Sequence, residues 1–387
     1  MRPSRALLCA LGVVAGAVSS VDLIPGALNP ATAGDARIET FVVHDPNASL
    51  VDLRARREEI GIAGVSRLRA TLSPAADCSS AGRPPPPIGR VRLPHYYLNL
   101  QYGPVDPRYA DAERPYASMW TTATRAASRY AAFAEPADAR CVFDVLEDWA
   151  KVDALLDYSA KESRQAWFVV EWAASAAGLA LSVARAEPSV PAEQRIRVLA
   201  WLTRVVRKQI SEPSGPISCC NNHAHWRGLM AMAAGVVTRD DELFRYGVMR
   251  FRDALDGIAA DGSFPLEMDR HERALHYQNY ALLPLVGIAE LASRQGYDLY
   301  KEHGRASRSI HDAVRFLLAA LDDQSLVRRY ASEPQYLGTF RPGAGDLAWM
   351  EAYRRRFPSP RFERFLTSAP FQPLLGGETL VYWHPLP

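Results

Sequence analysis

Apolar residues recur every three or four positions along most of the chain after residue 109. This spacing places apolar side chains on one face of a helix, whereas a half-buried strand would alternate every second residue. Several of the repeating segments are apolar on more than one face, as expected where helices pack in two layers. The pattern predicts helices over residues 117–134, 139–156, 164–186, 192–211, 221–237, 240–260, 270–296 and 306–322.

The links between these segments are short, so neighbouring helices are expected to run antiparallel as hairpins. No internal sequence repeat is recognisable. The pattern predicts an all-α protein, built either as a solenoid or as a closed α/α toroid. The last stretch, "RRFPSPRFERFLTSAPFQPLLGGETLVYWHPLP", is rich in proline and contains a β-like "ETLVYW". We expect it to cap or close the helical domain.

The first 92 residues differ from the rest. "MRPSRALLCALGVVAGAVSS" has two arginines, an apolar run and then small residues, which is the layout of a secretory signal peptide; a buried N-terminal helix is the alternative. Four consecutive prolines follow at 84–87, and they fit neither a helix nor a central strand. We therefore predict a signal peptide at 1–20, an irregular segment at 21–92 and the main domain at 93–387.

Composition and charge narrow the class of protein. Apolar residues make up 48% of the chain and aromatics 10%, which supports a large core. The formal charge is +2, and removal of Arg2 and Arg5 with the signal peptide leaves 2 − 2 = 0. The absence of a basic surplus speaks against nucleic acid as a partner. We expect a periplasmic or secreted monomer that does not associate with membranes.

Four cysteines would survive export, namely Cys78, Cys141, Cys219 and Cys220. An even number in an oxidising compartment favours one or two disulfides. Their spacing fits no zinc site. Which cysteines pair is not readable from the sequence.

Two segments concentrate polar residues beside apolar helical patterns. The first is "CCNNHAHWRG", at 219–228, and the second is "MDRHERALHYQNYALLPL", at 268–285. In the second, Arg270, Arg273, Tyr277 and Tyr280 lie at offsets 0, 3, 7 and 10. They share a face if the helix already includes Arg270. In an antiparallel stack of helices, the two segments can lie side by side.

An amide, an imidazole, a guanidinium and a phenol suit β-elimination on a uronic acid. Neutralising the sugar carboxylate stabilises the negative charge that develops when the neighbouring proton leaves. A histidine or tyrosine can take that proton, and a tyrosine can protonate the departing oxygen. A glycosidase would instead need two placed carboxyl groups.

"NNHAHW" and "RHERALHYQNYAL" resemble the two signature segments of the alginate lyase family of helical polysaccharide lyases, N-N-H-S-Y-W and R-A-L-A-Y-H-N-Y-A-L. Their separation matches, and weaker similarity extends over most of residues 95–385. The resemblance implies an incomplete α/α barrel with a deep groove, no metal or other cofactor, and an anionic polysaccharide as substrate.

The resemblance also implies roles. Asn222 and Arg270 would neutralise the substrate carboxylate, and His223 would be a base or a carboxylate stabiliser. Tyr277 would be the general acid, and also the base on mannuronate, whereas guluronate would require His223 as base. Tyr102 is similar to a tyrosine on a mobile lid over the groove. Mannuronate-rich alginate is thus the expected substrate.

Other residues of the two segments are candidates for substrate binding. His225 and His276 would line the groove. Trp226 would offer a stacking platform for a sugar ring, or else would be part of the core. Arg273 would supply a further positive charge.

The chain departs from the family pattern at several positions. The usual lysine before the lid tyrosine is Gln101, and the tyrosine after N-N-H-S is His225. Leu374 stands where an arginine usually precedes L-G-G, and His276 stands where many relatives have a small residue. Other uronate polymers, such as glucuronan, hyaluronan or polygalacturonate, therefore stay open.

Less specific interpretations remain for each residue taken alone. Asn221 and Asn222 could cap a helix, Tyr277 and Tyr280 could belong to the core, and the arginines could be solvated.

Two further functions also stay open. A glycoside hydrolase would use carboxylates such as Asp144 or Glu267, although the cluster at 144–148 is typical of a solvated helix face. A catalytically silent polysaccharide-binding or scaffold protein would retain the groove.

Overall fold

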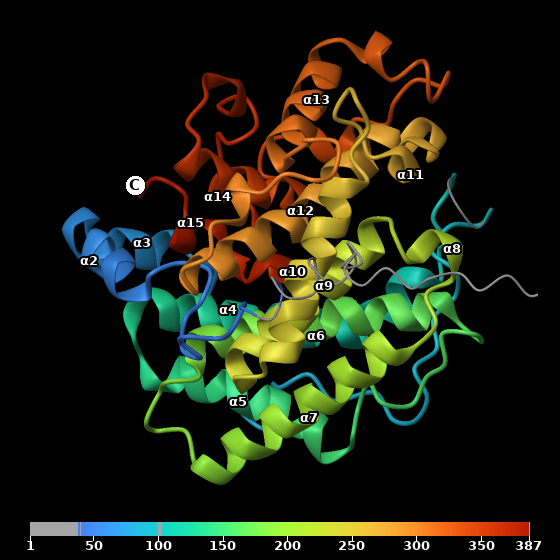
Figure 1. Cartoon of the computed structure of the whole chain (residues 1–387). Coiled ribbons are helices and arrows are strands. Elements are labelled where there is room, and N and C mark those ends of the chain that lie inside the picture. Colours follow the sequence, from blue (N-terminus) through green and yellow to red (C-terminus); the bar gives the residue numbers. More distant parts are fainter. Residues whose placement is uncertain (1–37, 39, 100–102, 387) are drawn as a thin grey trace, which may run out of the picture. The chain divides into compact units, whose positions relative to one another are not determined.

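The computed structural model describes residues 38, 40–99 and 103–386. Helices dominate that part of the chain (Figure 1), which confirms the all-α prediction. Each segment with helical spacing overlaps one long helix. These helices are α4 (Tyr109–Phe133), α5 (Pro136–Lys151), α6 (Arg164–Ala184), α7 (Ala192–Ser211), α9 (Asn222–Thr238), α10 (Asp241–Asp256), α12 (Ala274–Arg294) and α13 (Ile310–Asp322).

The long helices pack in two rows. In the first row α4 contacts α6, α6 contacts α9, and α9 contacts α12. The long helices that follow each of these in the sequence form the second row: α5 packs on α4 and α6, α7 on α6 and α9, α10 on α9 and α12, and α13 on α12. Alternation of the two rows along the chain is what short links between antiparallel helices produce.

Helices α6 and α9 lie at the centre of this packing, and nearly all of their side chains are buried. Within the described residues, α6 is the helix long and apolar enough to cross a membrane by length and composition alone. Its apolar character has another explanation here, because it is enclosed by α4, α5, α7 and α9. The buried side chains of α6 include the carboxylate of Glu171, which becomes important for the site.

Shorter elements complete the structure. The C-terminal "ETLVYW" is not a strand as expected. Only Gly377 and Glu378 pair with Phe371 and Gln372, and the backbone then turns into a helix closed by the bond from Trp383 N–H to Thr379 O. The shorter elements are α2 (Leu53–Ala63), α3 (Val65–Thr71), α8 (Gly215–Ser218), α11 (Pro265–Met268), η1 (His271–Arg273), η2 (Leu299–Lys301), η3 (Gln324–Leu326), η4 (Gly338–Phe340), η5 (Gly345–Leu347), α14 (Ala348–Arg356), η6 (Pro360–Phe362), β1 (Phe371–Gln372), η7 (Pro373–Leu375), β2 (Gly377–Glu378) and α15 (Thr379–Tyr382).

The segment before residue 92 is less independent than predicted. Residues Ile38–Pro387 form one compact unit, so no boundary falls at residue 92. Asp52 caps α2, and the guanidinium of Arg56 in that helix donates to the carbonyls of Leu380, Val381 and His384 near the C-terminus. These buried bonds join the segment to the main domain. The predicted signal peptide lies outside the described residues.

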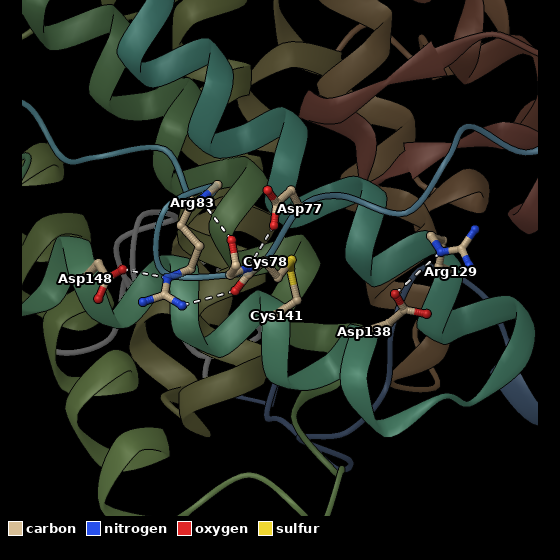
Figure 2. The surroundings of a disulfide bond; sticks show 9 residues. Asp77, Cys78, Arg83, Arg129, Asp138, Cys141 and Asp148 are labelled. Carbon is tan, nitrogen blue, oxygen red and sulfur yellow. Dashed lines mark hydrogen bonds and ion pairs between the residues drawn. A yellow bond between two sulfur atoms is a disulfide. The ribbon is translucent and has the colours of Figure 1, made fainter.

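The structure pairs the four cysteines that the sequence left unpaired. Cys78 forms a disulfide with Cys141 of α5, which ties the irregular segment to the helical rows. Figure 2 shows Arg83 beside this disulfide, donating to the Cys78 carbonyl at 3.1 Å and to Asp148 at 2.7 Å. Cys219 and Cys220 pair with each other directly ahead of α9.

Candidate active site

The four predicted catalytic residues Asn222, His223, Arg270 and Tyr277 line one cavity of about 720 Å³. The prediction that the two polar segments meet is therefore confirmed. The rest of the wall is mostly aromatic, amide and charged, with a few apolar side chains, and comes from α4, α6, α8, α11, α12, η7 and the loops. These further lining residues are His95, Tyr96, Tyr97, Tyr109, Glu113, Trp120, Arg164, Gln165, Phe168, Trp172, Ile217, Ser218, Asn221, Leu266, Asp269, His276, Tyr280, Asp346, Gln372, Pro373 and Leu374.

The N-terminus of α9 presents Asn222 and His223 to the cavity. Asn221 is the N-cap residue, and its side chain accepts a hydrogen bond from the His223 N–H at 3.1 Å. Asparagine is among the preferred N-cap residues because its side-chain oxygen satisfies a backbone donor that the first turn leaves unpaired. The capping interpretation thus holds for Asn221, and it fixes where the next two side chains begin.

His223 is held by a buried carboxylate. Its Nδ1 lies 2.5 Å from Oε1 of Glu171 on α6, and its ring stacks on Phe168 with centroids 3.4 Å apart. Burial and the positive charge of Arg227 lower the pKa of His223 well below its ordinary value. The ring is therefore neutral near pH 7. With Glu171 ionised, the Nδ1–H donates to the carboxylate and Nε2 is left as the basic nitrogen.

Glu171 is itself fully buried, and its surroundings decide its charge. Burial raises the pKa of Glu171 well above its ordinary value, while Arg227 at 3.4 Å and Gln209 at 3.4 Å lower it. Arg227 in turn donates to the carbonyl of Ser218 and lies 4.4 Å from the centre of the Trp167 ring. A buried carboxylate next to a buried guanidinium is expected to be ionised, because the unpaired arginine would be costly.

Asn222 is held by a second buried carboxylate. Its Nδ2 lies 3.1 and 3.0 Å from the two oxygens of Glu267, and its backbone N–H donates to the same residue at 2.5 Å. Within the described residues, Asn222 Oδ1 is buried without a hydrogen-bond partner. Burial raises the pKa of Glu267. A protonated Glu267 could donate to Oδ1, and the carboxamide would then turn Nδ2 toward a bound anion.

Arg270 and Tyr277 approach from the start of α12, but not on one continuous helix as expected. The helix begins at Ala274, and Arg270 lies in the turn before it. His271 has a φ of 50°, a left-handed conformation that interrupts the helix. Arg270 nevertheless reaches Tyr277, because its guanidinium carbon lies 4.6 Å from the centre of the tyrosine ring.

The hydroxyl of Tyr277 has a second tyrosine as partner. Tyr97 Oη lies 3.0 Å away, and the guanidinium of Arg273 lies 5.0 Å from the centre of the Tyr97 ring. Burial raises the pKa of Tyr277 well above its ordinary value, and Arg270 opposes this rise. Tyr277 therefore carries its proton near pH 7 and can act as an acid, while the adjacent guanidinium reduces the cost of its phenolate.

The predicted binding residues divide into three groups. His276 lines the cavity. Tyr102 and Gln101 lie outside the described residues. His225, Trp226 and Arg273 do not line the cavity.

These three binding predictions are corrected for different reasons. Trp226 has no exposed surface and packs 5.3 Å from the Tyr280 ring, so it belongs to the core. His225 is 2% exposed and faces Phe264. Arg273 instead contacts the rings of Tyr97 and Tyr336, behind the cavity wall. Its positive charge therefore acts on the site through Tyr97.

Three residues of the site were missed by the sequence analysis: Glu171, Tyr97 and, as the partner of Asn222, Glu267. Glu171 had a signal, since it is a lone carboxylate in the apolar run "WFVVEWAASAAGLAL", and a buried charge requires a partner. Tyr97 stands in "HYYLNL", where no feature of the sequence distinguishes its role from that of Tyr96.

The carboxylates of the hydrolase alternative do not face each other across the cavity. Asp144, Glu147 and Asp148 on α5 are engaged by Gln194, Arg197 and Arg83 outside it. Glu267 lies behind Asn222 and does not line the cavity. The pair of opposed carboxyl groups that glycoside hydrolysis needs is therefore not formed by these residues.

Comparisons with known proteins agree with this geometry. Residues 65–326 match the alginate lyase family. A polysaccharide lyase of Stenotrophomonas maltophilia is 31% identical over 325 residues, which cover 82% of this chain and 95% of the relative. An alginate lyase of Pseudomonas syringae pv. syringae is 29% identical over 63% of this chain and 65% of its own length.

Solved structures are similar over nearly the whole domain. A tyrosine-to-phenylalanine variant of alginate lyase A1-III, complexed with a tetrasaccharide, superposes with a TM-score of 0.86 at 44% identity, covering 90% of this chain and 99% of that one. Alginate lyase A1-III from Sphingomonas species A1 gives a TM-score of 0.84 with the same identity and coverage. By the match of its sequence and the agreement of its helices, the chain belongs to the alginate lyase family and is a polysaccharide lyase.

Proposed function

We propose that the chain cleaves an anionic polyuronate by β-elimination without a metal ion, and that mannuronate-rich alginate is a substrate. The observation that carries this proposal is the meeting of Asn222, His223, Arg270 and Tyr277 around one cavity. The kinship with alginate lyases supports the choice of polymer.

The substrate carboxylate would lie against Arg270 and Asn222. Removal of the proton at C5 places negative charge on this carboxylate, and a guanidinium and an amide N–H stabilise that charge most when it has fully developed. Arg270 is already positioned by the Tyr277 ring. The same two side chains, Arg270 and Asn222, would therefore neutralise the bound carboxylate and stabilise the charge that develops on it.

Tyr277 would move the proton. On mannuronate, the C5 hydrogen and the O4 leaving group lie on the same side of the ring. One phenol can therefore accept the C5 proton as phenolate and donate a proton to O4. The C4–O4 bond breaks and a C4=C5 double bond forms, so no water is consumed. On guluronate, the neutral imidazole of His223 would take the proton from the opposite side.

The test is the appearance of the unsaturated uronate, which absorbs in the near ultraviolet, after mixing with a panel of uronate polymers. We expect product to form in EDTA as it does without it. Tyr277→Phe should abolish product while polymer binding persists. Tyr246→Phe is the matched control, since Tyr246 does not line the cavity. Reducing ends without the double bond would instead indicate a hydrolase, and binding without turnover by the unmodified protein would indicate a scaffold.

We further infer that the protein is exported to the periplasm or beyond and acts as a monomer with the helices arranged as an incomplete α/α barrel. The two disulfides among the described residues support an oxidising compartment. Cell fractionation of the full chain, compared with a version lacking residues 1–20, tests the export. Light scattering of the purified protein tests the monomer.

A further inference from the structure

The charged side chains that line the cavity are unequal in number. Among the described residues that line the cavity, two carry a permanent positive charge, Arg164 and Arg270. Three carry a carboxyl group, namely Glu113, Asp269 and Asp346. A cleft for a chain of uronates alone would be expected to match negative sugars with positive side chains at successive positions. The position of the carboxylates therefore bears on which polymer fits.

Two tyrosines on α12 line the cavity and have different neighbours. Tyr277 contacts Arg270, with 4.6 Å between the guanidinium carbon and the ring centre. Tyr280, three residues on, stacks with His276 at 5.9 Å between ring centroids, and its pKa is raised by burial and by the charge of Asp346. We call the lining residues Asn222, His223, Arg270 and Tyr277 the uronate side. We call the lining residues Glu113, His276, Asp346, Gln372 and Leu374 the acidic side, because Glu113 and Asp346 both raise the pKa of Tyr96 and Asp346 lies 3.8 Å from His276 Nδ1.

Asp346 is the central group of the acidic side. Its carboxylate lines the cavity and its side chain is 25% exposed. No described residue donates a hydrogen bond to this carboxylate; the nearest basic atom is His276 Nδ1 at 3.8 Å. Burial lowers the pKa of His276 to about 3, so that ring is neutral and offers no positive charge. A largely buried carboxylate that lacks donors from the protein is suited to accept them from a ligand.

The remaining groups on this side are also uncharged or acidic. Glu113 accepts a hydrogen bond from the Tyr109 hydroxyl at 3.0 Å, and it contributes with Asp346 to the raised pKa of Tyr96, which burial dominates. Leu374 is apolar, and Gln372 uses its Oε1 to accept the Leu374 N–H at 3.1 Å. A uronate carboxylate placed here would meet two carboxylates and no cation from these residues.

We propose that the acidic side binds an uncharged sugar of the polymer, with Asp346 accepting hydrogen bonds from its hydroxyl or amide N–H groups. The preferred substrate would then be a polysaccharide in which a uronate alternates with an uncharged sugar. This inference rests on the proposed function and narrows its substrate class. Polyuronates such as alginate would still be cleaved, but less efficiently, because their second carboxylate meets Asp346 and Glu113.

Glucuronate polymers provide a matched test, since glucuronate and mannuronate have the same configuration at C4 and C5. The probes are polyglucuronate and a polymer of glucuronate alternating with N-acetylglucosamine, of equal length and both linked through O4 of glucuronate. The unsaturated product is measured at pH 7.5 and low salt, where Asp346 is ionised. We expect kcat/KM to be at least about tenfold higher on the alternating polymer.

Two substitutions should move this ratio. Asp346→Asn removes the negative charge and should reduce the preference about tenfold. Leu374→Arg adds a positive charge to the acidic side and should raise kcat/KM on polyglucuronate. Leu266→Arg is the control, since Leu266 lines the cavity and directly precedes Glu267, the partner of Asn222. It should change kcat/KM on both polymers alike. Melting temperatures of all three variants show whether each is folded.

The outcomes separate the two proposals. If no uronate polymer yields unsaturated product, the proposed function is overturned. If product forms but polyglucuronate is preferred, or if Leu266→Arg shifts the ratio as much as Leu374→Arg, the uncharged-sugar subsite is overturned while the lyase reaction stands.

Discussion

The two walls that meet at the uronate side are built in different ways. On the α9 wall, Asn222 and His223 are each hydrogen-bonded to a fully buried glutamate, Glu267 and Glu171. On the α12 wall, Arg270 and Tyr277 are positioned by ring contacts and by the Tyr97 hydroxyl. The first wall gives each side chain a fixed carboxyl partner. The second keeps a phenol beside groups that tolerate both of its protonation states.

This difference implies a division of labour. A carboxylate partner sets which nitrogen of a histidine carries the proton, and this must be decided before substrate binds. A phenol that gives and takes a proton must not be locked in one state by a charged partner. Substitutions on the two walls should therefore affect the reaction differently, in the size of the rate loss and in the pH profile of kcat.

On the α12 wall, Arg270→Lys retains a positive charge but loses the planar group over Tyr277. Loss of one preorganised donor to a developing charge typically costs about 10²- to 10³-fold in rate, and we expect kcat/KM to fall by that range. Initial rates of unsaturated product formation measure it. Arg250→Lys is the control, because Arg250 does not line the cavity. Full activity in Arg270→Lys would contradict the role of the guanidinium.

On the α9 wall, Glu171→Gln removes the charge that orients His223. We expect kcat to fall roughly 10²-fold with little change in KM, the size of effect that follows misplacement of a reacting group. The pH profile of kcat should also change, which a purely structural loss would not cause. Glu290→Gln is the matched control, since Glu290 is a buried carboxylate paired with Arg356 and Tyr300 away from the cavity. An unchanged pH profile of kcat in Glu171→Gln would contradict the proposed role of Glu171 in orienting His223.

Helix α9 should also make the fold sensitive to acid, through His225, which lies outside the cavity wall. Burial lowers the pKa of His225 to about 3, so the folded protein keeps this ring neutral while the unfolded chain protonates it near pH 6.5. Stability is thus lost as pH falls below 6.5, and at pH 5 the loss from this one residue is about 2 kcal/mol. Urea unfolding at pH 7 and pH 5 measures it. His225→Gln should lose that much less between the two pH values, and an equal loss would contradict the assignment.

The smallest effect is expected from Tyr97→Phe, which removes the hydroxyl that bonds Tyr277 but keeps the ring under Arg273. One neutral hydrogen bond is worth about 1 kcal/mol, so kcat should change less than about tenfold. The same rate assay measures it. A loss as large as that of Tyr277→Phe would show that the second tyrosine handles the proton itself.

The sequence predicted the helices well because their periodicity depends on local spacing. It predicted the meeting of Asn222 and His223 with Arg270 and Tyr277 because two long motifs matched a family in type and order. It was wrong about His225, and it left open whether Trp226 binds sugar or belongs to the core, for a physical reason. Helix α9 is buried on nearly every side, so no apolar stripe marks which of its faces meets the cavity.

Other features depend on contacts between residues far apart in the sequence. The pairing of Glu171 with His223 joins α6 to α9, and no local pattern contains it. The turn at Arg270 follows from one left-handed residue, His271, where the spacing alone suggested an uninterrupted helix. The boundary expected at residue 92 was wrong, and the segment before it is not wholly irregular, since it contains α2 and α3. Its composition does not reveal the contacts of Arg56 with the C-terminal carbonyls.

The hydrogen bonds from Arg56 to the carbonyls of Leu380, Val381 and His384 have a practical consequence for truncated versions of the protein. Removing the residues from Leu380 onward would leave the buried guanidinium with Glu59 as its remaining acceptor, and removing α2 would leave those carbonyls without their donor. Either truncation therefore leaves a buried polar group without its partner at a position 325 residues away in the sequence. Recombinant versions meant for crystals or assays should therefore retain both α2 and the residues from Leu380 onward.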